Sequence, residues 1–309
     1  MQATHVAFAD ESYCSAERYR SIATVTLARE TADNLTSRLF ELLNESGLKE
    51  LKWSKLRQAR ERFAALKFID LVVEEALNGR IRVDILIWDT EDSRHKVKGR
   101  DDQANLQRMY YHLFKNVLHR WPSGTMWALY PDENSALDWA TVADFLDTAG
   151  FNLKAESSLL SRLPFRARLE RDFQIIELVE MDSTKAPICQ VADLFAGLGA
   201  FSRKRYFQYC EWLEQRSNQL PLFPTARAKL SNSDKERCTV LKYLDDLCKR
   251  HKLGVGLRSS HGLRTYNPAN PINFWPYEPQ HPEDKAPTKS SRRRLPNVHV
   301  VGGANADIL

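Results

Sequence analysis

The chain has 309 residues, a formal net charge of +5 and 43% hydrophobic side chains, enough apolar surface to bury a sizeable core. This composition excludes disorder throughout, and a pI near 8.9 allows a polyanionic partner without requiring one. No run of about 18 apolar residues and no basic-then-apolar leader is visible. We therefore expect a cytoplasmic protein without a membrane partner.

Cysteine chemistry is not indicated by this sequence. The five cysteines are an odd number without a C-x-x-C pair, which argues against a disulfide framework and against a zinc site. The P-loop, zincin, hydrolase-elbow and dinucleotide-binding motifs are also missing. Any catalytic chemistry is therefore expected from carboxylates.

The first 80 residues predict two strands followed by two helices. Apolar and β-branched runs mark strands at His5–Ala9 and Arg20–Ala28, which we expect to form a hairpin. Apolar residues at helical spacing then mark helices at Ala32–Asn44 and Arg60–Leu77, each followed by a glycine. The segment Glu50–Ser54 between the helices is too short for an element of its own.

The middle of the chain alternates strands with helices, which is typical of an α/β fold. Strands at Ile81–Trp88 and Thr125–Tyr130 flank a helix at Leu106–Arg120, and this order predicts that the two strands pair in parallel. A helix at about Leu137–Thr148 and a strand at Phe173–Val179 follow, before a helix that opens at a proline in position 187.

Beyond residue 201 the periodic pattern weakens. Asp234–Lys252 has the spacing of a helix, whereas Phe274–Trp275–Pro276–Tyr277 is expected to pack on the core as an irregular strap. We therefore expect a mixed sheet flanked by helices at residues 1–212 and a helical and irregular appendage at 213–278. A flexible, proline-rich and basic tail is expected at 279–309.

Three aspartates, Asp10, Asp89 and Asp132, each follow an apolar strand, at the carboxyl end where open α/β sheets place their sites. Carboxylates brought together repel unless a cation neutralises them, and Mg²⁺ or Mn²⁺ takes oxygen ligands. Two such ions about 4 Å apart can stabilise the attacking and leaving oxygens of a phosphodiester displacement. The pattern predicts a metal-dependent phosphodiesterase, although each aspartate could also be a solvated turn residue.

Further candidates lie in a helix and in the short segment between the first two helices. Asp193 has apolar neighbours and is expected to be semi-buried, while Gln190, one turn earlier, could orient it or contact substrate. Glu50 is a weaker candidate, because glutamate is common on exposed loops. Lys52 and Trp53 beside it could hold a phosphate and stack on a base, or could form a surface anchor.

These marks resemble a bacterial family known as domain of unknown function 3800. The resemblance is carried by four stretches, of which the last is the most specific: Asp10-Glu11-Ser12, Glu50-Leu51-Lys52-Trp53, the Asp132 of A-L-Y-P-D, and Gln190-Val191-Ala192-Asp193-Leu194-Phe195-Ala196-Gly197. It implies a ribonuclease H-like fold and a two-metal catalytic site. The metal ligands would be Asp10, Glu50, Asp132 and Asp193, and the substrate contacts Glu11, Lys52, Trp53 and Gln190.

The expected function is therefore a nuclease that uses Mg²⁺ or Mn²⁺ to hydrolyse RNA, DNA or a hybrid. Sequence order permits Asp89 as a metal ligand in place of Asp132, and that choice stays open. The alternatives are a catalytically inactive module of the same fold that binds nucleic acid or protein, and a metal-free carboxylate-pair enzyme such as a glycosidase. The resemblance also implies a setting in phage defence or a mobile element, with a possible partner protein from a defence operon.

Overall fold

A computed structural model describes residues 2–12, 17–92, 101–134, 137–156, 166–216 and 230–278. The tail predicted at 279–309 lies outside these residues. The strands are β1 (His5–Ser12), β2 (Tyr19–Ala28), β3 (Ile81–Asp89), β4 (Thr125–Pro131), β5 (Phe151–Glu156), β6 (Arg166–Arg171), β7 (Phe173–Leu178), β8 (Val255–Leu257), β9 (Leu263–Thr265) and β10 (Ile272–Pro276). The helices are α1 (Arg29–Glu45), the 3₁₀ turn η1 (Trp53–Lys55), α2 (Ala59–Leu77), α3 (Asp102–Leu118), α4 (Trp139–Ala149), α5 (Pro187–Lys204), α6 (Tyr206–Arg216) and α7 (Asn232–Arg250).

A six-stranded sheet with the order β10-β3-β2-β1-β4-β7 forms the centre of the molecule. Strand β2 is antiparallel to β1 and β3, whereas β1 with β4, β4 with β7 and β3 with β10 are parallel pairs. The predicted opening hairpin is confirmed, and so is the mixed α/β class. The arrangement is consistent with a ribonuclease H-like fold.

One predicted strand pairing is wrong. Strands β3 and β4 run in the same direction but are not neighbours, because β2 and β1 lie between them. Each strand of the opening hairpin has a second edge that pairs with another strand. Strand β2 pairs with β3 from Leu27↔Ile81 onward, and β1 pairs with β4 from His5↔Trp127 onward. The connection through α3 therefore crosses two strands instead of joining adjacent ones.

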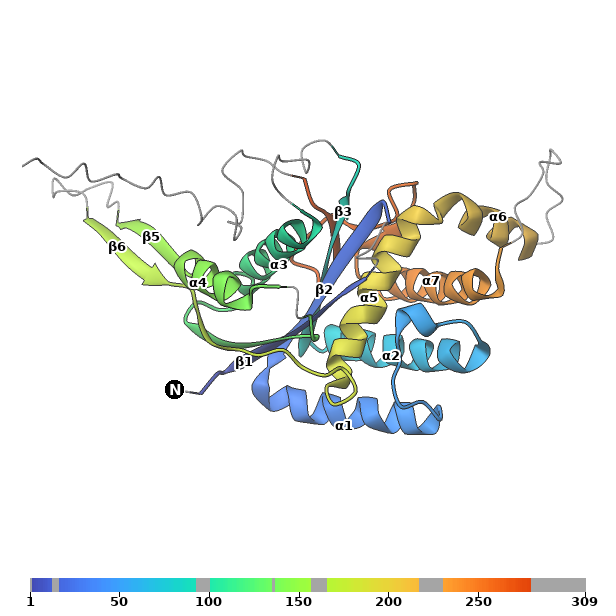
Figure 1. The fold of residues 1–309 in the computed structure, drawn as a ribbon, viewed down its shortest axis with the longest axis horizontal. Helices are drawn as coiled ribbons and strands as arrows, with labels where there is room; N and C mark the ends of the chain where they lie inside the picture. The colour runs from blue at the N-terminus through green and yellow to red at the C-terminus, as the bar shows by residue number, and fades with distance from the viewer. Residues whose placement is uncertain are drawn as a thin grey trace, which may run out of the picture.

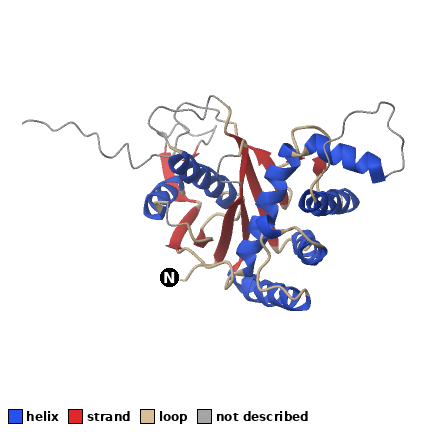
Figure 2. Ribbon diagram, turned by 45° about the vertical axis from the view of Figure 1, so that its right-hand side comes forward, coloured by secondary structure: helices blue, strands red, loops and turns tan. Residues whose placement is uncertain are grey.

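Helices cover both faces of the sheet, as Figures 1 and 2 show. Side chains alternate between the faces along each strand, so Val6 and Phe8 of β1 pack towards α1, α2, α5 and α7, while Ala7 and Ala9 pack towards α3 and α4. Two apolar cores result, one on each face. Polar side chains of the strands follow the same alternation, so each lies beside one of the two cores.

The segment predicted as an appendage adds a strand to the main sheet. Strand β10 pairs in parallel with β3, with Ile272 opposite Val83, and Phe274 is fully buried. The expected packing of Phe274–Tyr277 on the core is confirmed, but as an edge strand and not as an irregular strap. Pro276 is tolerated because it lies at the end of an edge strand.

In the part of the chain that the structure describes, no helix is long and apolar enough to cross a membrane. Cys189, Cys210, Cys238 and Cys248, the cysteines within that part, are free thiols.

Candidate functional site

Asp10 and Asp132 lie side by side at the carboxyl edge of the sheet. Strands β1 and β4 are parallel with Ala9 opposite Pro131, so the next residues on the two strands are these aspartates. The backbone N–H of Asp132 donates to the carbonyl of Ala9 at 2.8 Å, which extends the pairing beyond β4. Asp10 is only 6% exposed. Strand register alone therefore brings two carboxylates together.

Asp193 reaches the same place from α5, which lies across β1 and β2 (Figure 1). The Ser21 hydroxyl of β2 donates to the Ala196 carbonyl of α5 at 2.6 Å. Gly197 allows the close packing, because a Cβ there would lie 2.1 Å from Cγ of Trp53. The small residues of this helix thus hold Asp193 against the sheet, where it is 7% exposed and so more buried than the expected semi-burial.

The loop that carries Glu50 and Lys52 is tied to α5 through its backbone. The Leu51 N–H donates to Oε1 of Gln190 at 2.9 Å, and the Trp53 N–H donates to Oδ2 of Asp193 at 2.6 Å. Gln190 in turn donates from Nε2 to the Ser183 carbonyl at 2.7 Å. Gln190 is fully buried, so it positions the loop and presents no group to a substrate.

The ammonium group of Lys52 lies among the carboxylates. Its Nζ is 3.1 Å from Oδ2 of Asp132 and 3.6 Å from Oε1 of Glu50. Burial acts to lower the pKa of Lys52, but the negative charges of Asp10, Asp132 and Glu50 together raise it above its usual value. Lys55 adds a second cation, 2.9 Å from Glu50. Together with Asp193, the cluster has four carboxylates around two lysines, an excess of negative charge.

This excess is visible in the proton affinity of the two most buried carboxyls. Burial first, and then the charge of Asp193, raises the pKa of Asp10 well above its usual range. Burial also raises the pKa of Asp193 to about 7, with the charges of Asp132 and Glu50 acting in the same direction. A cation bound beside them would favour the ionised forms.

The donor set fits a hard divalent cation, although the side chains are not arranged around one. Among the residues that the structure describes, no three His, Cys, Asp or Glu side chains converge in metal-binding geometry. Carboxylate oxygens are the ligands that Mg²⁺ and Mn²⁺ take, and positive charge is in deficit here. Asp10, Asp132 and Asp193 would hold the cation with Glu50 beside them, and Lys52 would have to withdraw from the carboxylates.

Asp89, the competitor of Asp132 in the sequence, lies elsewhere. Ala23 pairs with both Asp10 and Ile85, so Asp89 is two strands away and four residues further along β3, at least about 13 Å. Its carboxylate accepts a hydrogen bond from Nη2 of Arg18 at 2.9 Å. Although partial burial opposes it, this bond holds the pKa of Asp89 below its usual value. The aspartate that joins the cluster is therefore Asp132.

Two curated proteins match almost the whole chain. "Uncharacterized protein ORF2'" of Methanothermobacter thermautotrophicus is 43% identical over 289 residues, which cover 91% of this chain and 96% of that protein. "Uncharacterized protein ORF2" of the same organism is 43% identical over 291 residues, covering 91% and 97%. The chain belongs to this ORF2 family. No protein-family model and no solved structure matches it, so the resemblance to the domain of unknown function 3800 family stays a prediction.

Two side chains expected to contact substrate are turned away from the cluster in this ORF2-family fold. Trp53 is 2% exposed and packs edge-on against Phe201, with ring centroids 5.5 Å apart, so neither face of the indole is open to a base. Glu11 points to the opposite face of the sheet, where it accepts hydrogen bonds from Tyr110 and, at 2.8 Å, from Asn134. The structure offers neither group to a substrate at the carboxylates.

Sequence reasoning missed two residues of the carboxylate cluster, Lys55 and Ser183, which hold Glu50. The Ser183 hydroxyl donates to Oε1 and the Lys55 ammonium to Oε2, each at 2.9 Å. Against the effect of burial, these bonds hold the pKa of Glu50 below its usual value. The spacing of Lys52 and Lys55 by one 3₁₀ turn was the available signal for Lys55, and nothing in the sequence marked Ser183.

Proposed function

We propose that this ORF2-family protein is a Mg²⁺- or Mn²⁺-dependent nuclease that hydrolyses phosphodiester bonds of nucleic acid. The observation that supports it most is the meeting of Asp10, Asp132 and Asp193 at the carboxyl edge of a ribonuclease H-like sheet. Glu50 lies beside them, and the group carries more negative than positive charge. Such an arrangement is costly for a fold unless a cation is bound there in the working state.

Divalent cations at this position would activate a water and stabilise the leaving oxygen of the phosphodiester. The chain's own contribution is rigidity. Oδ1 of Asp10 accepts the Glu11 N–H at 2.7 Å, and Oδ2 of Asp193 accepts the Trp53 N–H at 2.6 Å, so backbone donors fix the direction of both carboxylates. Lys52, at the same edge, supplies a positive charge for a substrate phosphate.

The test is cleavage of end-labelled RNA, DNA and RNA–DNA hybrid in Mg²⁺, in Mn²⁺ and in EDTA. We expect cleavage with metal only, and its loss in Asp10→Asn and in Asp193→Asn. Asp33→Asn is the matched control, because it makes the same chemical change on the exposed side of α1, away from the cluster. Cleavage that survives Asp10→Asn, or no cleavage of any substrate by the folded wild type, contradicts the proposal.

One observation favours a second candidate, a catalytically inactive module of the same fold that binds nucleic acid or protein. Lys52 already lies among the carboxylates, where it neutralises part of their charge. An inactive module predicts binding without cleavage and a melting temperature that does not respond to Mn²⁺. A Mn²⁺-dependent rise in Tm that Asp10→Asn abolishes speaks against it.

A further inference from the structure

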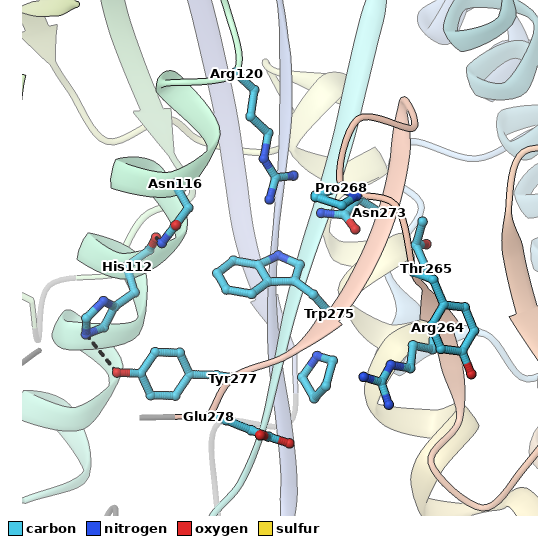
Figure 3. A pocket seen from close by; sticks show the side chains of 12 residues that line it. His112, Asn116, Arg120, Arg264, Thr265, Pro268, Asn273, Trp275, Tyr277 and Glu278 are labelled. Carbon is cyan, nitrogen blue, oxygen red and sulfur yellow. Dashed lines mark hydrogen bonds between the residues drawn. The ribbon is translucent and has the colours of Figure 1, made fainter. Parts of the chain in front are cut away.

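Two cavities flank the end of β10, away from the carboxylates. The first has a volume of about 390 Å³ and lies between α3, β9 and β10; Arg120, Arg264 and Trp275 are among the residues that line it (Figure 3). The second has a volume of about 530 Å³, and its lining includes Arg203 at the end of α5. Residues 276–278 border both cavities, so the two are adjacent. Together they are called the β10 cleft below.

Arg203 is held firmly in the wall of the β10 cleft. Its Nε donates to the His261 carbonyl at 2.7 Å. The backbone of Gly262 packs so closely that a Cβ there would lie 2.5 Å from Cγ of Arg203, and φ of Gly262 is +75°. The β8–β9 hairpin therefore fixes the stem of this arginine, while no carboxylate among the described residues forms an ion pair with its guanidinium.

Arg264 brings a second guanidinium to the same cleft. Burial lowers the pKa of Arg203, and the charge of Arg264 lowers it further, although Asp89 and Glu278 act in the opposite direction. Within the described ranges, Arg264 has no ion pair either, and its contact is with the ring of Tyr266 at 5.1 Å. Arg264 in the first cavity and Arg203 in the second thus place two guanidiniums along the β10 cleft, and guanidiniums bind anions such as phosphates.

Aromatic side chains accompany the two arginines. Figure 3 shows the indole of Trp275 between Arg120 and Arg264, and its Nε1 is buried with no hydrogen-bond partner among the described residues. In the second cavity Phe207 is 70% exposed. Arginines interleaved with aromatic rings are the combination that holds phosphates and bases of a single nucleic-acid strand.

Acidic groups also lie at the β10 cleft, and two of them are paired with arginines. Asp89 is paired with Arg18, and Asp84, behind the first cavity, is bonded to Arg82 and Arg120. Glu278, exposed on the shared border, and Asp92, which lines the second cavity, oppose an anion. Removing the negative charge of Glu278 should therefore increase the affinity of the cleft for an anion.

We propose that the β10 cleft binds a segment of a single nucleic-acid strand, with Arg203 and Arg264 on its phosphates and with Trp275 and Phe207 against its bases. This rests on the proposed nuclease function and adds the path of the substrate beyond the carboxylates. Helix α5 links the two places: the ten residues from Asp193 to Arg203 span about 15 Å.

The test measures binding of a fluorescent single-stranded 12-mer, as DNA and as RNA, to the full chain in EDTA, so that no cleavage occurs. We expect the double variant Arg203→Gln, Arg264→Gln to bind at least about tenfold more weakly. The slope of log affinity against log salt should fall by about 1.4, since each lost phosphate contact of a single strand accounts for about 0.7. Glu278→Gln should bind more tightly than the wild type.

The double variant Lys67→Gln, Lys242→Gln is the charge-matched control, because these lysines lie on α2 and α7 and pair with the exposed Glu45 and Asp246. If the arginine double variant does not fold, Phe207→Ala is tested in its place, because this exposed ring supports no core. We expect Phe207→Ala to bind the oligonucleotide about fivefold more weakly. Equal affinities of the wild type and the arginine or Phe207 variants overturn the proposal, as does a wild type that binds neither oligonucleotide. Arginine-dependent binding by a wild type that cleaves none of the substrates in Mg²⁺ or Mn²⁺ contradicts the nuclease function alone.

Discussion

The sheet carries a buried aspartate on each of its faces, and the two have opposite surroundings. Asp10 lies on the α5 side, where its nearest charged neighbours include Asp132 and Asp193 and the balancing charge comes from Lys52. Carboxylates there outnumber cations. The site is therefore stable only if protons, lysines or metal ions make up the difference.

Asp84 of β3 lies on the α3 side and is fully buried. Its Oδ1 accepts from Asn273 at 3.0 Å, from Arg82 at 3.3 Å and from Arg120, so two guanidiniums bond the same carboxylate oxygen. This group is a closed ion-pair network that joins β3 and β10 to the end of α3. Burial alone does not mark a functional aspartate, and the balance of charge around it is the better criterion.

The largest test of this difference is a pair of substitutions with opposite effects on stability. Asp84→Ala leaves two partly buried arginines without their carboxylate and should lower the free energy of unfolding by about 3–5 kcal/mol. Asp10→Asn relieves repulsion and should raise it in EDTA. Denaturant unfolding of both variants measures the signs, and a loss of stability in Asp10→Asn would remove the distinction drawn between the two faces.

The second test uses pH. The pKa of Asp193 is raised from 3.8 to about 7 in the folded chain, so between these values the folded state keeps a proton that the unfolded state has lost. Stability is then highest at acid pH and falls as pH rises through about 4 to 7. In EDTA, Asp193→Asn should therefore gain on the wild type across this window, by up to a few kcal/mol. A difference that does not change with pH contradicts the raised pKa.

The third test concerns the packing that brings Asp193 to the sheet. A methyl group at Gly197 would overlap the ring of the buried Trp53, so Gly197→Ala should lower the free energy of unfolding by about 1–3 kcal/mol. Gly47→Ala is a poor control because its φ is +64°, whereas Ala200→Gly, in the same helix, loses stability without overlap. Cleavage per folded molecule should fall only in Gly197→Ala.

The sequence predicted where the strands and helices lie better than it predicted which strands pair with each other. Alternating apolar runs located β1 to β4 and β7, because periodicity is a local property. The pairing of β3 with β2 and with β10 depends on which strand edges are open, and β10 lies more than 180 residues after β3. No local pattern carries that information, so the predicted β3–β4 pair was wrong.

The candidate site shows the same limit. Asp10 and Asp193 are marked by their apolar neighbours, but the choice between Asp89 and Asp132 depends on register, which places Asp132 next to Asp10 and Asp89 four residues past its level. The role of Gln190 depends on a hydrogen bond to a loop about 140 residues earlier. Such contacts follow from packing, which the sequence alone does not specify.

The smallest expected change in stability, that of Lys52→Gln, is also the most informative about a bound cation. Lys52 lies 3.1 Å from Asp132 and its side chain is 27% exposed, so Lys52→Gln should cost about 1–2 kcal/mol of stability in EDTA. Mn²⁺ should restore that loss, since a divalent ion replaces the missing ammonium, and it should bind the variant more tightly than the wild type. The corresponding change on the other face, Arg82→Gln beside Asp84, should not respond to Mn²⁺, because Arg120 and Asn273 remain bonded to that carboxylate. Thermal unfolding of the two variants with and without Mn²⁺ compares them directly. An equal response in both would show that neither face of the sheet is selective for a metal ion.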